Sequence, residues 1–229
     1  MQRVSRNLKG RDFAVGDIHG CFSALQHALQ SVQFNESIDR LFSVGDLVDR
    51  GPESHLVLHW LAKPWFYAVC GNHDFMAWRA ALGDPYPEVD HNMHGGDWLD
   101  ALDENQLQKI AIALKALPLA MEVETSLGNI GMVHADCPFD DWNQMHLAPW
   151  HNISHISKLG DYSLWGTVRH AKQYKTAIKN VRAVVHGHVV LRQPQVLGNV
   201  YFIDTGGWRE GGSFTLLELE PLTLHFKKT

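Results

Sequence analysis

Three short polar segments in the first third of the chain combine carboxylates, imidazoles and glycines: residues 16–20 (GDIHG), 45–51 (GDLVDRG) and 71–74 (GNHD). Carboxylate, amide and imidazole groups suit first-row divalent metals rather than soft thiolate chemistry. The flanking glycines allow tight turns, which let side chains on neighbouring turns reach one ion. Two later positions, His134 and residues 186–188 (HGH), also place histidines after apolar runs. Together these residue types and spacings predict a metal site.

Each of these positions follows a short apolar run that predicts a buried strand. The runs are residues 13–15, 41–44, 66–70, 129–133 and 183–185. Helices are predicted between the first runs, over residues 21–32, 54–61 and 75–82. Strands that alternate with helices indicate βαβ units and a largely parallel sheet. Because ligands of open α/β sheets bind at the carboxyl ends of the strands, we expect all five positions to converge on one edge.

Ordinary turn formation is the alternative explanation for these polar residues. A lone Asp or His after a strand, such as Asp17, is more often a turn former or a helix N-cap than a ligand. Five such positions after five apolar runs are much harder to explain in this way, because turns accept Ser, Pro or Lys as readily. The metal site is therefore predicted for the set, while any single member keeps its alternative role.

The rest of the chain predicts two further helices and several strands in a single domain, residues 1–229. The helices are expected over residues 97–102 and 104–117, and the strands over residues 119–124, 200–203, 214–218 and 222–226. Residues 137–164 lack clear periodicity and are expected to form a long surface loop with short helical turns. A loop of this length inside a compact domain is usually functional.

Composition excludes several classes of protein. The chain has 229 residues, of which 45% are hydrophobic, and a formal net charge of −5. It is therefore an ordinary globular protein without the broad basic surface that nucleic acids or anionic membranes require. The apolar runs are too short to span a membrane, and the N-terminus lacks an export signal, so we expect a cytoplasmic location. The scattered Cys21, Cys70 and Cys137 predict a reducing compartment and small buried thiols, not disulfides or nucleophiles.

The polar segments together resemble the GDxHG–GDxVDRG–GNH[DE] signature of the PPP-type metallophosphoesterases. The resemblance is strongest to small bacterial and lambda-phage-type serine/threonine protein phosphatases. It continues through residues 133–136 (VHAD), 187–188 (GH) and 203–206 (IDTG), and so spans roughly residues 12–206. It implies the metallophosphoesterase-type α/β fold, a β-sandwich of two mixed sheets flanked by helices, with the site at the C-terminal ends of strands.

The resemblance also implies two metal ions, typically manganese or iron, with zinc possible. In this comparison Asp17 and His19 match ligands of the first ion and Asp46 matches a carboxylate that bridges both. The matches for the second ion are Asn72, His134 and His188. Two such ions activate a water molecule for in-line attack on phosphorus.

The histidine at position 186 is left open. The family pattern of Gly-His points to His188 as the ligand, and His186 occupies a position that is usually apolar. We expect His186 to pack beside the site, with a ligand role as the alternative. Alternate residues of an extended strand share one face, so geometry alone does not separate the two histidines.

Three residues match the acid and phosphate-binding groups of the family. His73 matches the general acid that protonates the leaving alkoxide. Asp49 matches the carboxylate that orients this histidine and raises its pKa. Arg50 matches a phosphate-binding guanidinium, which holds two phosphate oxygens in a fork.

A second phosphate-binding arginine is expected later in the chain. Arg169, four residues after Trp165, is the best match, although a solvated helix arginine is the alternative. Arg79 and Arg209 are weaker matches. No phosphoenzyme is required.

The expected function is metal-dependent hydrolysis of serine or threonine phosphomonoesters in phosphoproteins or phosphopeptides, with small phosphoesters accepted in vitro. Related diadenosine tetraphosphate hydrolases typically carry alanine where Asp49 stands, so the aspartate favours phosphomonoester hydrolysis. Hydrolysis of diadenosine tetraphosphate or of another nucleotide is the first alternative. A catalytically silent phosphoprotein-binding module is the second, and the complete set of matched residues opposes it. Nucleic acid and membrane partners are not expected.

Specificity is expected to come from residues 137–164 and 208–212. We expect Trp142, Trp150 and Trp165 to be packing residues, and lining a groove is the alternative for each. Residues 93–98 (MHGGDW) resemble a segment of small bacterial relatives and are given no chemical role.

Overall fold

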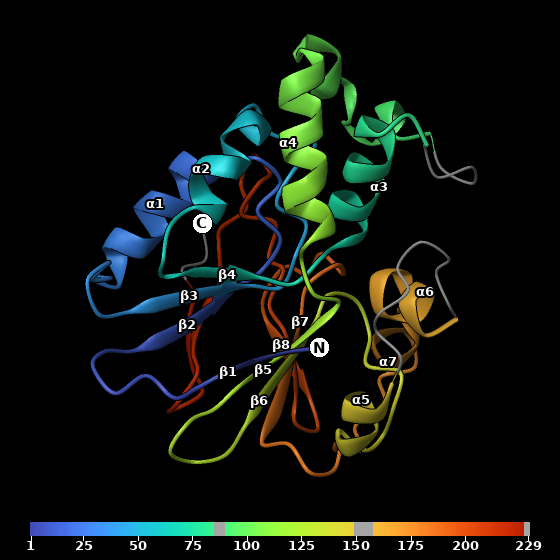
Figure 1. Cartoon of the computed structure of the whole chain (residues 1–229). Helices are drawn as coiled ribbons and strands as arrows, with labels where there is room; N and C mark the ends of the chain where they lie inside the picture. Colours follow the sequence, from blue (N-terminus) through green and yellow to red (C-terminus); the bar gives the residue numbers. More distant parts are fainter. Residues whose placement is uncertain (85–89, 149–157, 227–229) are drawn as a thin grey trace.

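The computed structural model describes residues 1–84, 90–148 and 158–226, and its strands form two mixed sheets (Figure 1). The six-stranded sheet contains, in spatial order, β1 (Gln2–Val4), β5 (Ala120–Val123), β6 (Ile130–Val133), β7 (Ala183–His186), β9 (Val200–Phe202) and β8 (Gln195–Leu197). The five-stranded sheet contains β11 (Thr223–His225), β10 (Leu216–Glu218), β2 (Asp12–Val15), β3 (Arg40–Ser43) and β4 (Phe66–Ala68). The expected sandwich of two mixed sheets is confirmed.

The parallel strands end level with one another, which is what positions the site. Val15 of β2 pairs with Ser43 of β3, and Ser43 pairs with Ala68 of β4. In the second sheet β6, β7 and β9 also run parallel, with Met132 opposite Val185. Polar residues that follow these strands therefore emerge at the same edge of the sandwich.

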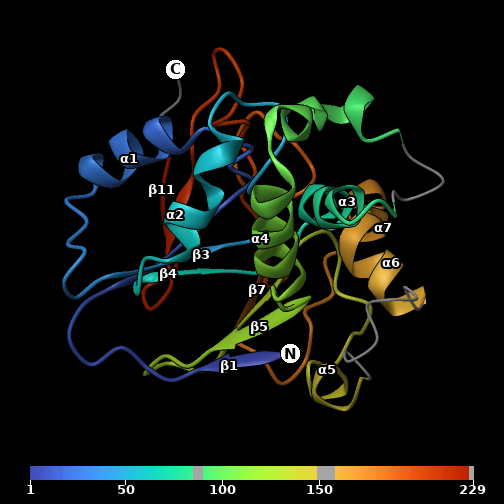
Figure 2. The ribbon, with the colours of Figure 1, turned by 45° about the horizontal axis from the view of Figure 1, so that its top comes forward.

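Helices cover the outer faces of both sheets. The side of the five-stranded sheet that faces away from its partner carries α1 (Phe22–Ser31), α2 (Val57–Leu61), α3 (Asn72–Ala81) and α4 (Glu104–Lys115) (Figures 1 and 2). The second sheet is flanked by α5 (Asn143–Leu147), α6 (Lys158–Trp165) and α7 (Val168–Ala171). Short 3-10 turns span Ser54–Leu56, Asn92–His94 and Asp97–Ala101.

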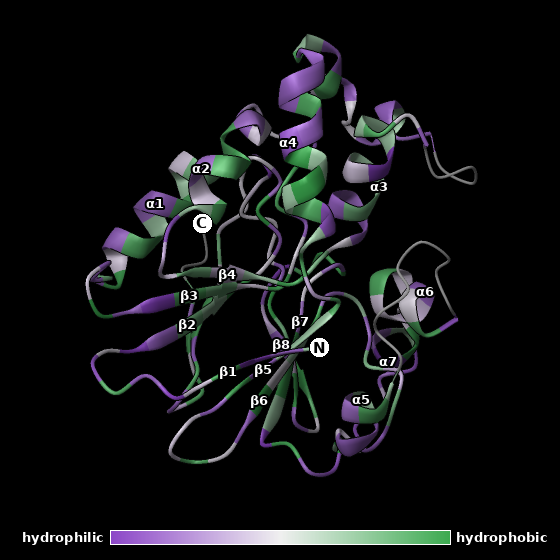
Figure 3. Cartoon of the chain, viewed as in Figure 1, coloured by the Kyte–Doolittle hydropathy of each residue, from purple (hydrophilic) through white to green (hydrophobic). Residues whose placement is uncertain are grey.

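Strand alternation divides the apolar side chains among these layers. Phe13 and Val15 of β2 pack in the cluster beneath the helices, whereas Ala14 packs in the cluster between the sheets. This is the two-residue period of a strand buried on both faces. Helices α1 and α4 carry both hydrophobic and hydrophilic residues, as expected where only one face of a helix is buried (Figure 3).

Several boundaries differ from the expectations. Helix α3 begins at Asn72 rather than at residue 75, because Asp74 accepts a hydrogen bond from the backbone N–H of Gly71 (2.9 Å) and so caps the first turn. The segment expected as a helix at 97–102 is a 3-10 turn. Strands β1 and β8 and helix α7 were not expected, because each has only three or four residues and no readable period.

The segment expected as a loop, 137–164, holds α5 and part of α6. Trp142 is fully buried in the cluster on the outer face of the six-stranded sheet, and Trp165 packs against the other outer cluster, so packing is confirmed for both. Trp150 lies outside the described residues. The three cysteines are free; Cys70 and Cys137 are buried, and Cys21 is half-buried. Within the described ranges, the helices are all too short or too polar to cross a membrane.

Candidate active site

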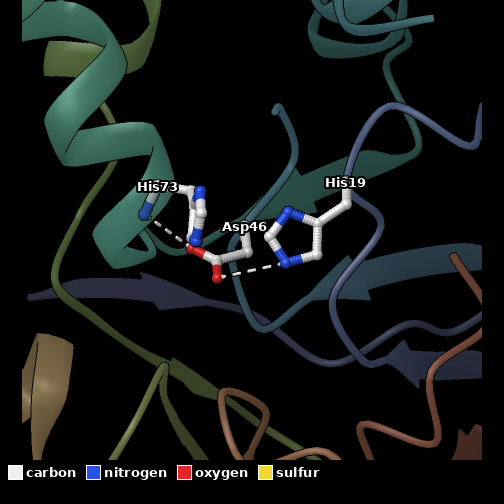
Figure 4. A group of neighbouring side chains, drawn as sticks. All are labelled: His19, Asp46 and His73. Atoms are coloured by element: carbon white, nitrogen blue, oxygen red, sulfur yellow. Dashed lines mark hydrogen bonds and ion pairs between the residues drawn. The ribbon is translucent and has the colours of Figure 1, made fainter. Parts of the chain in front are cut away.

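The residues that follow the parallel strands meet around one carboxylate, Asp46. Its Oδ2 lies 3.5 Å from His19 Nε2 and 3.5 Å from His134 Nε2. Ligand atoms of His19, Asp46 and His73 lie within 4.8 Å of one another, and so do those of Asp46, His134 and His188. Two groups that could each hold a metal ion therefore share Asp46. Figure 4 shows the first group, with His19 and His73 on two sides of the carboxylate.

Other expected ligands border the same two groups. The Oδ2 atom of Asp17 lies 4.0 Å from His19 Nε2, and Oδ1 of Asp17 accepts the backbone N–H of His188 at 3.0 Å. Asn72 Oδ1 lies 2.9 Å from His134 Nε2 and 3.0 Å from His188 Nδ1. The structure thus brings together all six residues that were expected to hold metal.

Backbone conformations with positive φ angles position several of these side chains. Among the described residues, nine other than glycine have positive φ, and five of them belong to the predicted site: His19 (45°), Asp46 (52°), Asp49 (72°), Arg50 (66°) and His188 (62°). Such conformations persist only where the surroundings enforce them, and they cluster at functional sites. Here the backbone N–H groups of Ile18 and His19 both donate to the carbonyl of Asp46, at 2.9 and 2.8 Å, and tie two of the turns together.

Glycine is required where backbone passes against the acidic side chains. A Cβ at Gly71 would collide with the carboxylate of Asp46, and a Cβ at Gly187 would collide with that of Asp17. These two glycines therefore let four loops approach one another closely enough for their side chains to share an ion.

The imidazole rings of His19 and His134 are oriented as metal ligands are. His19 Nδ1 lies 2.9 Å from the carbonyl of Val48, and His134 Nδ1 lies 2.9 Å from the carbonyl of Val44. A carbonyl only accepts, so each Nδ1 carries the proton and each Nε2 presents a lone pair to the centre of the site. Metal-bound histidines are commonly oriented by this kind of bond from the other ring nitrogen.

Lone pairs face one another at the centre, and this arrangement fits a cation. The Nε2 lone pair of His134 faces Asn72 Oδ1 and Asp46 Oδ2, which are both acceptors. Burial holds the pKa of His134 well below its usual value, so a proton does not fill the gap near neutral pH. A divalent ion with oxygen and nitrogen ligands would satisfy all three atoms.

The closely spaced buried carboxylates also indicate a site for a cation. Burial, together with the neighbouring Asp204 and Asp46, raises the pKa of Asp17 well above its usual value. Burial and the nearby Asp74 raise the pKa of Asp46 in the same direction. Asp204 lies in the 203–206 motif, but the sequence assigned it no role. Its contact with Asp17, which follows a strand of the other sheet, shows that it belongs to the site. The charge of a bound metal would stabilise these carboxylates in their ionised form.

The expected acid pair is present. His73 Nδ1 lies 2.8 Å from Asp49 Oδ2, and both side chains are buried. Burial lowers the pKa of His73 more than any other cause, so the net pKa lies below its usual value, and Arg50 lowers it too. Asp49 raises the pKa of His73, as expected, but by less than burial lowers it. Hydrogen bonds from His73 and His91 outweigh burial at Asp49 and lower its pKa, so this carboxylate is ionised.

Arg50 lies beside the site with its side chain against an aromatic ring. Its Nη1 atom is 2.8 Å from His19 Nε2, and its guanidinium carbon is 4.6 Å from the ring centre of Trp208. Arg209 stacks on the same indole, also at 4.6 Å. The segment expected to supply specificity, 208–212, therefore borders the site through Trp208.

The other arginine expected to bind phosphate, Arg169, has its guanidinium held by backbone carbonyls and a carboxylate. Its Nη1 donates to the carbonyls of Tyr174 (3.1 Å) and Thr176 (2.7 Å), and its Nη2 approaches Asp140 at 3.4 Å. Only 5% of the residue is exposed, so it is not the solvated helix arginine of the alternative reading. A phosphate-binding role for Arg169 stays a prediction.

His186 is packed beside the site. Its Nδ1 donates to the carbonyl of Val133 at 2.8 Å, and its ring lies against Phe202. Within the described ranges, neither of the two groups of metal-ligating atoms includes it. This arrangement agrees with the expected packing role.

Known proteins resemble this chain in sequence over most of its length. The family described as calcineurin-like phosphoesterase matches residues 13–192. Over 222 residues the chain is 32% identical to serine/threonine-protein phosphatase 1 of Salmonella typhimurium, and the match covers 96% of each chain. It is 35% identical over 133 residues to a symmetrical bis(5'-nucleosyl)-tetraphosphatase of Methylococcus capsulatus, but that match covers 57% of this chain and 44% of the relative.

Solved structures show the same fold. A putative diadenosine tetraphosphatase superposes with a TM-score of 0.66 at 22% identity, covering 98% of this chain and 96% of the other. A cold-active protein tyrosine phosphatase superposes with a TM-score of 0.66 at 18% identity, covering 95% and 76%.

Proposed function

Because the chain belongs to the calcineurin-like phosphoesterase family, we propose that it is a metal-dependent phosphatase of phosphoserine and phosphothreonine in proteins. The observation that carries this proposal is the buried His73–Asp49 pair, 2.8 Å apart, beside Asp46. The alkoxide of serine or threonine is a poor leaving group, so its departure benefits from an acid held in this place. The relatives named as serine/threonine phosphatases match almost the whole chain, which supports the same substrate class.

The family implies divalent metal ions, and the donor atoms of the site fit them. We assign one ion to Asp17, His19 and Asp46. The second is assigned to Asp46, Asn72, His134 and His188. Mn²⁺ suits this mixture of oxygen and imidazole donors, and iron or zinc is the alternative. When bound, such ions lower the pKa of a coordinated water to about 7 and so supply a nucleophile at neutral pH.

The chain's own residues then bind the phosphate and move the proton. Arg50 is proposed to hold two phosphate oxygens with its guanidinium, exchanging its present contact with His19 for the substrate. In its doubly protonated form, His73 gives the proton of Nε2 to the leaving oxygen and becomes neutral, while its Nδ1–H remains bonded to Asp49. Asp49 thus fixes the tautomer and the direction of the ring.

Turnover of a phosphopeptide tests this function. Protein stripped of metal and reloaded with Mn²⁺ should release phosphate from phosphoserine and phosphothreonine peptides, and a chelator should abolish the reaction. An Asp46→Asn variant should lose turnover together with bound metal, whereas Asp100→Asn, whose side chain is exposed, should retain both. Metal-loaded protein without turnover on any phosphopeptide would refute the proposal.

Hydrolysis of diadenosine tetraphosphate is the second candidate, because the Methylococcus capsulatus relative is named as a bis(5'-nucleosyl)-tetraphosphatase and one similar structure as a putative diadenosine tetraphosphatase. A nucleotide leaving group departs as a stable phosphate anion. Its departure therefore depends less on protonation than the departure of a serine alkoxide does. The buried His73–Asp49 pair therefore favours the phosphomonoester. Rates measured side by side on the dinucleotide and a phosphopeptide decide between them, and a large preference for the dinucleotide would reverse our ranking.

A further inference from the structure

The carboxylate of Asp49 accepts hydrogen bonds from three side chains. His73 Nδ1 and His91 Nε2 each lie 2.8 Å from Oδ2, and Trp98 Nε1 donates to Oδ1 at 2.8 Å. Asp49 is completely buried and His91 is 6% exposed. The catalytic pair is therefore part of a four-residue cluster, and one of its members, Trp98, comes from the 93–98 segment that was given no chemical role.

A tight turn brings His91 and Trp98 to this position. The backbone N–H of Arg50 donates to the carbonyl of Gly95 at 3.2 Å, and the N–H of Gly96 donates to the carbonyl of His91 at 3.0 Å. Gly95 has a φ of 88°, and a Cβ there would collide with the backbone of Arg50. A Cβ at Gly96 would collide with the ring of His91. Gly95 therefore lets the turn lie directly against Arg50, and Gly96 leaves room for the ring of His91.

The hydrogen bond from His91 to Asp49 is made through Nε2 of the ring. His91 Nδ1 is buried and, among the described residues, has no hydrogen-bond partner. In its neutral form the ring has one N–H, and this N–H is placed on Asp49 rather than on a backbone group. A histidine that served packing alone would not need to place its donor on a catalytic carboxylate.

We propose that His91 and Trp98 are positioning residues, which hold Asp49 ionised and oriented so that it fixes His73. This inference rests on the proposed function, because it concerns the same reaction. A buried carboxylate is costly unless its lone pairs are satisfied. Without Trp98 the Oδ1 atom loses its donor, and without His91 the Oδ2 atom keeps only His73. In either case Asp49 can turn or take up a proton, and its hold on the His73 ring weakens.

Conservative variants separate positioning from packing. Trp98→Phe keeps an aromatic ring and removes the N–H, and His91→Leu removes the donor from the other oxygen. Each should lower kcat on a phosphoserine peptide by about 10-fold or more, as loss of such supporting bonds typically does. The fall on p-nitrophenyl phosphate should be much smaller, because that leaving group needs little protonation.

Two further variants serve as rescue and control. His91→Gln places an amide N–H near the former Nε2 position and should recover part of the loss. Met93→Ala changes a side chain of the same turn that is 83% exposed, and should leave kcat, KM and the pH profile unchanged. Equal losses on both substrates, or unchanged kcat in Trp98→Phe and His91→Leu, would overturn the proposal.

A measurement on metal-free protein is independent of turnover. The His73 Nδ1–H proton, observed by NMR, should give a downfield signal in the wild type and in Met93→Ala, and should shift or broaden in Trp98→Phe and His91→Leu. An unchanged signal in both variants would overturn the positioning role. If the signal responds but the wild type hydrolyses no phosphopeptide, positioning stands and the proposed function fails.

Discussion

Replacement of His73 by asparagine removes the proposed acid and little else. The Asn side chain can still offer an amide N–H to Asp49 near the former Nδ1 position, but it has nothing at the position of Nε2. The backbone N–H of residue 73 donates to Asp46 Oδ1 at 2.9 Å, and this bond does not depend on the side chain. We therefore expect the fold and the bound metal to be retained in His73→Asn.

The size of the effect follows from what a general acid contributes. A positioned acid is worth about 10²- to 10⁴-fold in rate, which corresponds to about 3 to 5 kcal/mol of activation free energy. The hydrogen bond of 2.8 Å to Asp49 and the burial of His73 define a single ring position, so the loss should lie within this range for a serine phosphate. For p-nitrophenyl phosphate, whose leaving group is stable as an anion, the loss should be much smaller.

The assay compares kcat on the two substrates, with metal content measured on the same samples. His59→Asn, on an exposed position of α2, is the matched control and should behave as the wild type. Full turnover of the phosphoserine peptide by His73→Asn would refute the assignment of the acid. Equal losses on both substrates at unchanged metal content would show that His73 acts in some other way.

Three further predictions concern phosphate binding and stability. Arg50→Ala should lower kcat/KM for a phosphopeptide by about 10- to 100-fold, measured by initial rates, because it removes charged hydrogen bonds to phosphate. Trp142→Phe should lower the free energy of unfolding by about 1 to 3 kcal/mol in urea titrations, because the buried Glu122 loses an N–H donor at 2.7 Å. At Asp39, burial raises the pKa but hydrogen bonds from Arg11 and Asn35 lower it further, so the folded pKa lies below the usual value. Asp39→Asn should therefore destabilise the protein at pH 7, and urea titrations should show the difference shrinking as the pH falls below about 4 and through the folded pKa.

The convergence of the predicted ligands could be read from the sequence because it depends on local rules. Asp17, Asp46 and Asn72 each follow a strand of the same parallel set, and parallel strands present their carboxyl ends at one edge. The start of α3 was missed by three residues, because the apolar period begins only at Phe75 while the cap at Gly71 extends the helix backwards. That extension places His73 in the first turn of the helix.

The support of Asp49 could not be predicted, because no pattern in the sequence links residue 49 to His91 and Trp98. The contact spans 42 residues to His91 and 49 to Trp98, and depends on a glycine turn with no apolar period. The net lowering of the pKa of His73 could not be predicted for a related reason, because it comes from burial, which is a property of the whole fold. Asp204 could be recognised only once the packing of the two sheets placed it beside Asp17.

Turnover measured as a function of bound Mn²⁺ tests the central claim most directly. The claim is that the residues around Asp46 hold two ions and that both are needed to hydrolyse a serine or threonine phosphate. Metal-free protein should be inactive on a phosphoserine peptide, and activity should reach its plateau only as the metal content approaches two ions per chain. Full activity without metal, or a plateau at one ion per chain, would contradict the account.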